Sequence, residues 1–299
     1  MRILIVASLG ILFLSGAGFL ILRSTKPSPA QHQTAPSQPS TSAASVVAAP
    51  PITEVTRPTL PRPPVALTDF WNKSTHDQTV HVTDLVTNTE LPIEIVRFLE
   101  SVVPTHGLDS VLRNNSAVAL LNQTEANPRL EPLFLAMAQD QSDSIQMREY
   151  ALQYLARSAE RAVNPSRAVA YLMRAARSQE GGIPGTALLH LDRLESNGIC
   201  TLGGEYDSLV RTILRDPRAD LLSSMTALNL VGQRKMADDL PYVRELAAGP
   251  VVALRRIALA VLGQIGDEHD ADVLSRAAAD ADPTIALAAS TAHQRLQTR

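Results

Sequence analysis

Apolar residues recur through much of the chain at positions i, i+3, i+4 and i+7, the spacing that places them on one face of an α-helix. The clearest copies are Ala227–Gln233 and Ala258–Gln264, which match nearly residue for residue at a shift of 31 positions. Met147–Leu155 follows the same template, and weaker copies run over 112–121 and 186–194. The pattern therefore predicts a repeated helix.

Segments of helical spacing also lie between these copies, so each repeat is predicted to be a helix pair. The expected second helices are 166–178, 204–215, 238–248 and 271–279. A helix pair of this length cannot bury its apolar stripe alone, and stacking of neighbours gives one continuous core. The fold class is predicted to be all-α: an α-solenoid of about six helix-pair repeats. Pro217, Pro250 and Pro283 recur every 33 residues, and each is expected near the start of a helix.

The C-terminal repeats resemble HEAT-like repeats, in particular the short bacterial type. The residues that carry this resemblance are Asp216-Pro217, Asp282-Pro283, Arg255, Ala258, Leu262-Gly263 and Gly266-Asp267. It covers residues 108–299 and is strongest in the last three units. The resemblance implies that the recurring arginines Arg148 and Arg255 brace neighbouring repeats. We also expect Asp216 and Asp282 to be helix N-caps.

The first 23 residues have the character of a membrane anchor. Ile3–Leu22 is a stretch of 20 residues without a charge, about 30 Å long as a helix and enough to span a bilayer. Residues 1–23 are predicted to be a single transmembrane signal-anchor. A cleaved signal peptide is the alternative, although the apolar run is long for one. We expect the soluble domain on the extracytoplasmic, periplasmic side.

Residues 24–68 contain ten prolines and thirteen serines or threonines. Such a segment cannot bury enough apolar surface to offset the entropy of ordering, and it is predicted to be a disordered linker. Residues 69–107 form a transition segment. Within it, Thr79–Thr83 alternates briefly like a strand, and Leu91–Val103 is expected to be the first helix. Trp71 is expected to fix the end of the linker onto the solenoid.

Charge and composition narrow the function. The chain has a net charge of −3, and residues 69–299 carry 22 basic and 29 acidic residues, a net charge of −7. A general nucleic-acid binder needs a basic face, so no nucleic-acid partner is expected. The single cysteine, Cys200, excludes an intrachain disulfide.

No catalytic motif of the hydrolase, P-loop or zinc-protease type occurs. Some HEAT-like proteins are di-iron hydroxylases that use His-Glu steps, and this sequence lacks those steps. The residues with metal-like types, His76, Asp77, His81 and Asp84, are expected to be solvated loop residues. Cys200 is expected to be a structural thiol. We therefore expect no catalytic, cofactor or metal residues, no cofactor, and a chain that is not an enzyme.

The leading hypothesis is a membrane-tethered scaffold whose concave face, lined by the second helices, captures an unknown protein partner. Arginines that follow an apolar pair in four successive second helices form the candidate binding stripe, suited to acidic segments of that partner: Arg174, Arg211, Arg244 and Arg276. Surface pairing of these arginines with nearby acids is the simpler interpretation. The alternatives are a HEAT-like lyase or cofactor-handling protein with a pocket on the concave face, and a mechanical spacer of the envelope.

Overall fold

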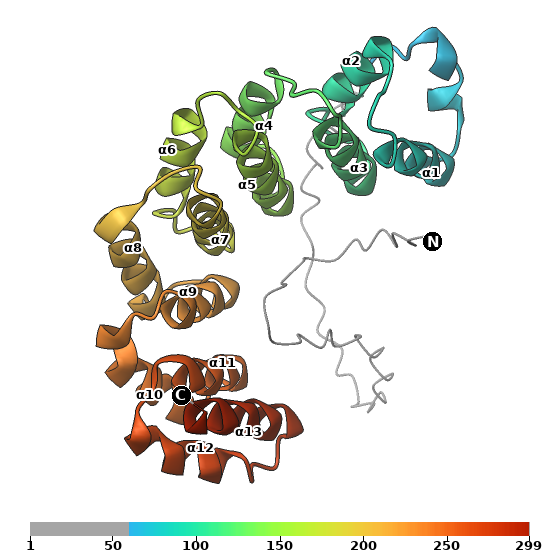
Figure 1. Cartoon of the computed structure of the whole chain (residues 1–299). Helices are drawn as coiled ribbons and strands as arrows, with labels where there is room; N and C mark the ends of the chain where they lie inside the picture. Colours follow the sequence, from blue (N-terminus) through green and yellow to red (C-terminus); the bar gives the residue numbers. More distant parts are fainter. Residues whose placement is uncertain (1–59, 299) are drawn as a thin grey trace, which may run out of the picture. The chain divides into compact units, whose positions relative to one another are not determined.

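A computed structural model describes residues 60–298 of the chain (Figure 1). The described residues all belong to one compact unit. These residues form α-helices and short 3₁₀ turns and contain no strand. The α-helices are α1 (Thr75–Val86), α2 (Ile93–Val102), α3 (Ser110–Leu121), α4 (Leu130–Gln139), α5 (Ile145–Ala159), α6 (Ser166–Ala175), α7 (Ile183–Ser196), α8 (Gly203–Arg215), α9 (Leu221–Gln233), α10 (Leu240–Ala248), α11 (Val252–Ile265), α12 (Ala271–Ala277) and α13 (Pro283–Gln297). The 3₁₀ turns are η1 (Val65–Leu67), η2 (Phe70–Asn72), η3 (Ala237–Asp239) and η4 (Glu268–Asp270).

From α3 onward the helices alternate between two rows. The odd-numbered helices pack against one another in sequence, from α3 through α13, whereas most even-numbered helices pack chiefly against the odd helices beside them. Within this unit the odd helices follow the inner rim of a curve and the even helices its outer rim (Figure 1). The expectation that the second helices line the concave face is therefore wrong, since α6, α8, α10 and α12 lie on the outer rim. The inner rim is formed by the odd helices, which pack directly against one another from repeat to repeat.

The predicted repeat is confirmed in its strongest copies. Ala227, Leu228 and Val231 of α9 are fully buried, as are their counterparts in α11, Ala258, Leu259 and Leu262. The expected second helices appear as α6, α8, α10 and α12, each within a few residues of its predicted bounds. The described residues thus form an all-helical, repeat-like stack.

Helix starts follow capping chemistry. Asp282 caps α13 by accepting hydrogen bonds from the N–H groups of Thr284 and Ile285, as predicted. Asp216 does not cap α9. It ends α8, accepts the N–H of Arg218, and leaves Asp220 as the N-cap of α9. Of the three recurring prolines only Pro283 begins a helix, whereas Pro250 directly precedes the N-cap of α11 and Pro217 lies three residues before that of α9.

Glycines lie at two close approaches between odd helices. A Cβ added to Gly185 of α7 would lie 2.7 Å from the Cα of Ser223 in α9. A Cβ added to Gly263 of α11 would lie 2.6 Å from the Cα of Ala292 in α13. Glycine is required at both positions because a backbone atom occupies the space of the side chain.

An aromatic cluster closes the N-terminal end of the described unit. Phe70 and Trp71 pack edge-on at 4.8 Å, and both contact Phe98 of α2. The Trp71 indole N–H donates to the carbonyl of Pro61 at 2.6 Å, and Leu67 is buried in the core. Residues 60–68, assigned to the linker by composition, are therefore ordered against the helices.

The transition segment is helical. Thr79–Thr83, which alternates like a strand, lies inside α1, where Val82 is fully buried and Ser74 caps the helix. The predicted first helix, Leu91–Val103, corresponds to α2. Across residues 60–298 no helix is both long enough and apolar enough to cross a bilayer. The anchor predicted for residues 1–23 lies outside the described residues.

Candidate functional site

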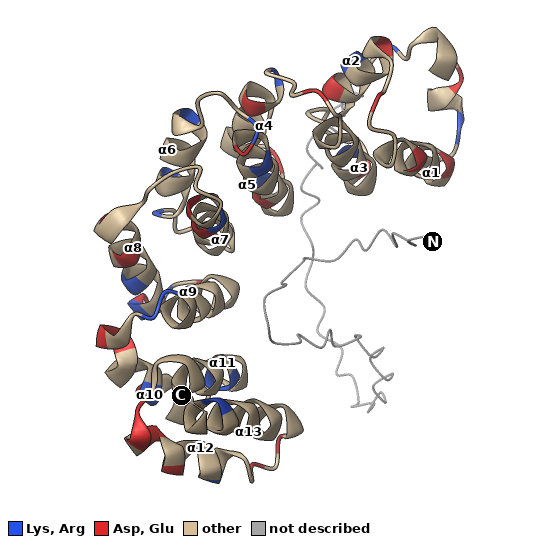
Figure 2. Cartoon of the chain, viewed as in Figure 1, with Lys and Arg blue, Asp and Glu red and all other residues tan. Residues whose placement is uncertain are grey.

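The predicted arginine stripe lies on the outer rim, and its four members have different surroundings. Arg211 of α8 donates from Nε to a carboxylate oxygen of Asp239 at 2.8 Å. Arg244 of α10 donates from Nε to Asp270 at 2.7 Å. Asp239 and Asp270 immediately precede α10 and α12, so each arginine joins its own second helix to the next one along the stack. Basic and acidic residues both occur along the outer-rim elements from α8 to α12 (Figure 2).

These two ion pairs have a buried acid and a half-exposed base. Asp239 and Asp270 are each 1% exposed, whereas Arg211 and Arg244 are 36% and 37% exposed. Hydrogen bonding to Asp239 raises the pKa of Arg211, and hydrogen bonding to Asp270 raises that of Arg244. Asp239 also pairs with Arg215 at 2.8 Å, and Asp270 also accepts the N–H of Asp267, so both buried carboxylates are fully engaged in polar contacts. Arg211 and Arg244 brace neighbouring repeats.

The two ends of the stripe are more open. Arg174 is exposed and lies over the ring of Tyr171, with 4.8 Å from its guanidinium carbon to the ring centroid. Arg276 is exposed and donates to the backbone carbonyl of Asp272. In the part of the chain that the structure describes, neither forms an ion pair with a carboxylate. The stripe remains a prediction, and these two arginines are the members available to a partner.

A second set of braces joins the first helices. Arg148 of α5 pairs with Glu180, just before α7, at 2.5 Å, and Arg255 of α11 pairs with Asp280, just before α13. The bracing role expected for both is confirmed. Arg113 of α3 pairs in the same way with Asp143 at 2.5 Å, with both side chains buried.

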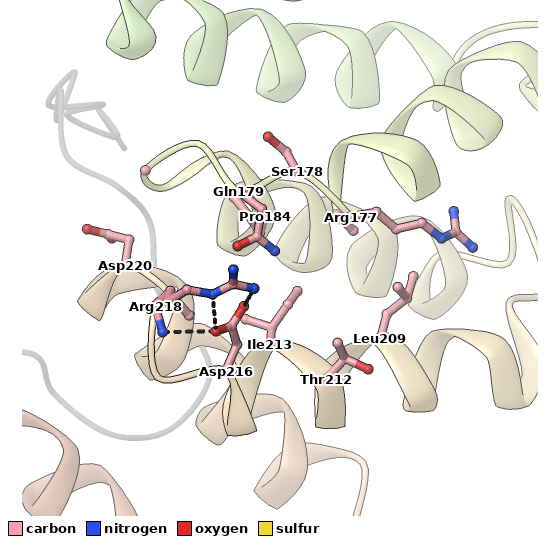
Figure 3. A pocket seen from close by; sticks show the side chains of 13 residues that line it. Arg177, Ser178, Gln179, Pro184, Leu209, Thr212, Ile213, Asp216, Arg218 and Asp220 are labelled. Carbon is pink, nitrogen blue, oxygen red and sulfur yellow. Dashed lines mark hydrogen bonds and ion pairs between the residues drawn. The ribbon is translucent and has the colours of Figure 1, made fainter.

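A small pocket lies where the α6–α7 and α8–α9 loops meet (Figure 3). Its volume is about 120 Å³, well below the roughly 300–1,000 Å³ of sites for drug-sized ligands. Pro184, Leu209 and Ile213 supply apolar walls. Asp216 and Arg218 face each other across one end, paired at 3.2 Å (Figure 3). The pocket lies at the loop edge of the stack, away from the inner rim where the sequence hypothesis placed one.

The residues with metal-like types are helical, not loop residues. His76, Asp77, His81 and Asp84 all lie on α1, and the His81 ring packs near Phe70, 6.2 Å between centroids. Over residues 60–298 the structure contains no group of three or more His, Cys, Asp or Glu side chains placed to hold a metal ion.

Cys200 is half-buried, and burial raises the pKa of its thiol, with a further contribution from the charge of Glu195. A raised pKa keeps the thiol protonated near neutral pH, which is the opposite of what activates a nucleophile. The structure thus agrees with the structural role expected for Cys200.

Sequence reasoning missed one polar cluster in the middle of the stack. Arg234, at the end of α9, forms ion pairs with Asp192, Glu195 and Asp207 at 2.6–3.0 Å and lies over the Tyr206 ring. Its side chain joins α7, α8 and α9. The signal was weak because the three acids are 27 to 42 residues away in sequence.

Comparisons with known proteins give a distant likeness to solved structures. No known protein family and no curated protein sequence matches it. Among solved structures, human deoxyhypusine hydroxylase in complex with glycerol is similar at 15% identity, covering 78% of this chain and 83% of that one, with a TM-score of 0.36.

This likeness is too distant to transfer an activity. The matched protein is nevertheless an enzyme, and that corrects the expectation that the chain is not an enzyme. The helical architecture gives no ground for excluding catalysis.

Proposed function

We propose that this chain is a HEAT-like repeat protein that binds another protein along its helical stack. The observation that supports the proposal is the row of equivalently placed helices from α3 to α13. Stacked helix pairs expose an extended, continuous surface, which suits recognition of a long partner segment. The four-arginine stripe contributes two exposed cations to this surface.

The proposal includes a membrane tether. The uncharged stretch Ile3–Leu22 supports an anchor, and the proline-rich residues 24–59 support a flexible connection of roughly 30 Å or more between membrane and domain. The helical domain would then meet partners close to the membrane, on the extracytoplasmic side.

The test is crosslinking of the full-length chain in intact cells, followed by protease treatment of intact and lysed spheroplasts. We expect discrete protein adducts and a domain that is digested once the outer membrane is opened, before the inner membrane is lysed. Recovery of the chain without any protein adduct would remove the binding proposal. Digestion only after lysis would place the domain in the cytoplasm.

A second candidate rests on the pocket between the α6–α7 and α8–α9 loops. Its apolar walls and the Asp216–Arg218 pair would suit a small molecule with both apolar and charged parts, handled by the chain as a lyase or cofactor-handling protein would. Thermal denaturation with a library of small metabolites tests this candidate. A shift that is lost in Ile213→Trp, which fills the pocket, would favour it over protein binding.

A further inference from the structure

Large aliphatic side chains are exposed at the starts of several odd helices. Val111 is the second residue of α3, Ile145 is the first of α5, Leu221 and Leu222 are the first two of α9, and Val251 and Val252 are the N-cap and first residue of α11; their exposed fractions run from 43% to 63%. Scattered surface aliphatics need no explanation, but recurrence in the first turn of successive odd helices means that they line one edge of the stack.

Contacts between the helix starts confirm that this edge is continuous. A Cβ added to Gly181, just before α7, would lie 2.5 Å from Cδ1 of Ile145 in α5. The Ser223 hydroxyl of α9 donates to the carbonyl of the same Gly181 at 3.2 Å. The starts of α5, α7 and α9 therefore lie side by side.

The aliphatic row is interrupted at α7, and the pocket takes its place. Ile183, which begins α7, is only 4% exposed. The residues around it, Gly181 and Pro184, line the pocket together with Ala219 and Asp220 before α9. The edge from α5 to α9 thus consists of exposed aliphatic side chains on both sides of a hollow with apolar walls.

Uncompensated charge at this edge is negative. Most charged side chains around the pocket are paired, as Arg148 is with Glu180 and Arg218 with Asp216. Within residues 60–298, Glu149 of α5 and Asp220 at the start of α9 form no ion pair. Burial raises the pKa of Glu149, and the charge of Asp220 raises it further. A hydrogen bond from the Gly182 N–H to the Glu149 carboxylate acts in the opposite direction and lowers this pKa. Two neighbouring carboxylates that have no cationic partner attract a positively charged side chain of another molecule.

We propose that the edge formed by Ile145, Leu221, Leu222, the pocket and the carboxylates of Glu149 and Asp220 binds an extended segment of another protein, one with lysine or arginine between aliphatic residues. This inference rests on the proposed protein-binding function and adds the surface and the chemistry of the partner. It differs from the arginine stripe, which lies on the outer rim and would take an acidic segment.

The spacing of the helices sets the length of the segment. From α5 to α9 is two interhelical distances, roughly 16–20 Å. An extended chain covers this in about five or six residues at roughly 3.3 Å each. One aliphatic side chain would contact Ile145, one would enter the pocket, and one would contact Leu222, while a cationic side chain reaches Glu149.

The experiment measures binding of labelled twelve-residue peptides to the full-length chain by fluorescence anisotropy. The test peptide repeats Leu-Lys-Pro-Val, in which proline keeps the segment extended and prevents peptide self-pairing. One comparison peptide has Glu in place of Lys, and another has Ser in place of Leu and Val. We expect binding of the test peptide, and at least tenfold weaker binding of both comparison peptides.

Two variants and two matched controls locate the site. Leu222→Ser is expected to weaken binding about tenfold, because the lost apolar contact corresponds to roughly 1.4 kcal/mol. Glu149→Gln, which keeps an acceptor for Gly182, is expected to weaken it about fivefold at low salt and less at high salt. Val163→Ser, at a fully exposed aliphatic in the α5–α6 loop, and Glu245→Gln, on the outer-rim helix α10, are expected to change binding less than twofold.

Several results would overturn the proposal: no binding of the test peptide, equal binding of the Glu peptide, equal loss in the control variants, or wild-type self-association that Leu222→Ser abolishes. Because Leu222 is 63% exposed, its variant is expected to keep the wild-type unfolding midpoint. If Leu222→Ser and Glu149→Gln still captured the crosslinked partner of the full-length chain, the assignment of the binding site to this edge would be wrong. The proposed protein-binding function would still stand.

Discussion

His190 of α7 occupies a position, counted from the N-cap, at which α5, α9 and α11 carry Leu152, Leu228 and Leu259. The imidazole is 8% exposed, and its Nδ1 has no hydrogen-bond partner. Burial lowers the pKa of His190 to about 4, and the charge of Arg193 lowers it further. A histidine at a leucine position therefore makes the core sensitive to acid.

The stability of the domain is expected to fall between pH 6.5 and pH 4. In this range the unfolded chain binds a proton at His190 and the folded chain does not, so protonation favours unfolding. The loss by pH 4.5 is expected to be about 2–3 kcal/mol from this group alone. Urea unfolding of wild type and His190→Leu at pH 7 and pH 4.5 measures it. Equal pH dependence in the two proteins would contradict the assignment.

The arginines of the outer-rim stripe are expected to separate into two classes. Arg244→Ala leaves the buried Asp270 carboxylate without its cation and is expected to cost about 2 kcal/mol, reduced from the value for a fully buried pair because Arg244 is partly exposed. Arg276→Ala is expected to cost less than about 0.5 kcal/mol, since it removes only an exposed backbone contact. Chemical denaturation of the two variants compares them. Similar losses of unfolding free energy in the two variants would mean that the Arg244–Asp270 ion pair does not stabilise the stack.

The partner of Arg244 could have been predicted from the sequence. Asp239 and Asp270 coincide at the 31-residue shift of the repeat, and a recurring acid before each second helix matches a recurring arginine in the helix before it. What the sequence does not contain is the burial of these acids. That depends on the packing of α8, α10 and α12 against their neighbours, so spacing alone does not distinguish Arg211 and Arg244, which brace the repeats, from the exposed Arg174 and Arg276.

Among the elements, the contact between α11 and α13 depends on one missing side chain. Gly263→Ala would place a Cβ 2.6 Å from the Ala292 Cα, so the helices would have to separate. The expected cost is about 1–3 kcal/mol, despite the gain of roughly 0.5–1 kcal/mol that alanine usually brings to a helix interior. Thermal denaturation followed by circular dichroism at 222 nm measures the change.

Gly204 provides the matched control. It lies in the first turn of α8, and a Cβ added there meets nothing within 4 Å. Gly204→Ala is expected to leave the melting temperature unchanged or to raise it slightly. If both variants lowered the melting temperature equally, close helix packing would not be the reason for glycine at position 263.

The helices were predictable where the repeat is regular, because the 3.6-residue period fixes the buried face. Their starts were less so. Asp216 and Asp282 both precede proline and both accept the N–H two residues on, so the local chemistry is the same. After Pro217, however, Asp220 offers a second N-cap and α9 starts there. Two competing caps within four residues cannot be ranked from spacing alone.

For the unit as a whole, the contacts of its N-terminal residues indicate which N-terminal deletions leave a folded domain. Removal of residues 1–59 is expected to leave a helical domain that unfolds cooperatively, since Pro61, Leu67 and Trp71 all remain. Removal of residues 1–74 also takes away Phe70 and Trp71, and it is expected to cost about 3–5 kcal/mol from the loss of buried aromatic surface alone.

Circular dichroism and urea unfolding of the two truncated chains make the comparison. Precipitation of the shorter deletion would mean that residues before 60 belong to the core. Composition placed the end of the linker at residue 68 because the proline content stays high to that point. Pro61 is held by a hydrogen bond from Trp71, and Leu67 is buried in the core; composition contains no information about such contacts.

Neighbouring helices are held by different contacts on the two rims of the stack. We therefore expect the stack to resist closing more strongly than straightening. On the inner rim, backbone atoms of α7 and α9 and of α11 and α13 already meet at Gly185 and Gly263, so a tighter radius would compress atoms that cannot yield. On the outer rim, Arg211 and Arg244 link successive helices through long, partly exposed side chains, each paired with a buried carboxylate. Backbone contact at these two glycines therefore opposes any further closing of the curve. A partner bound along it would be accommodated by straightening or twisting, never by closing.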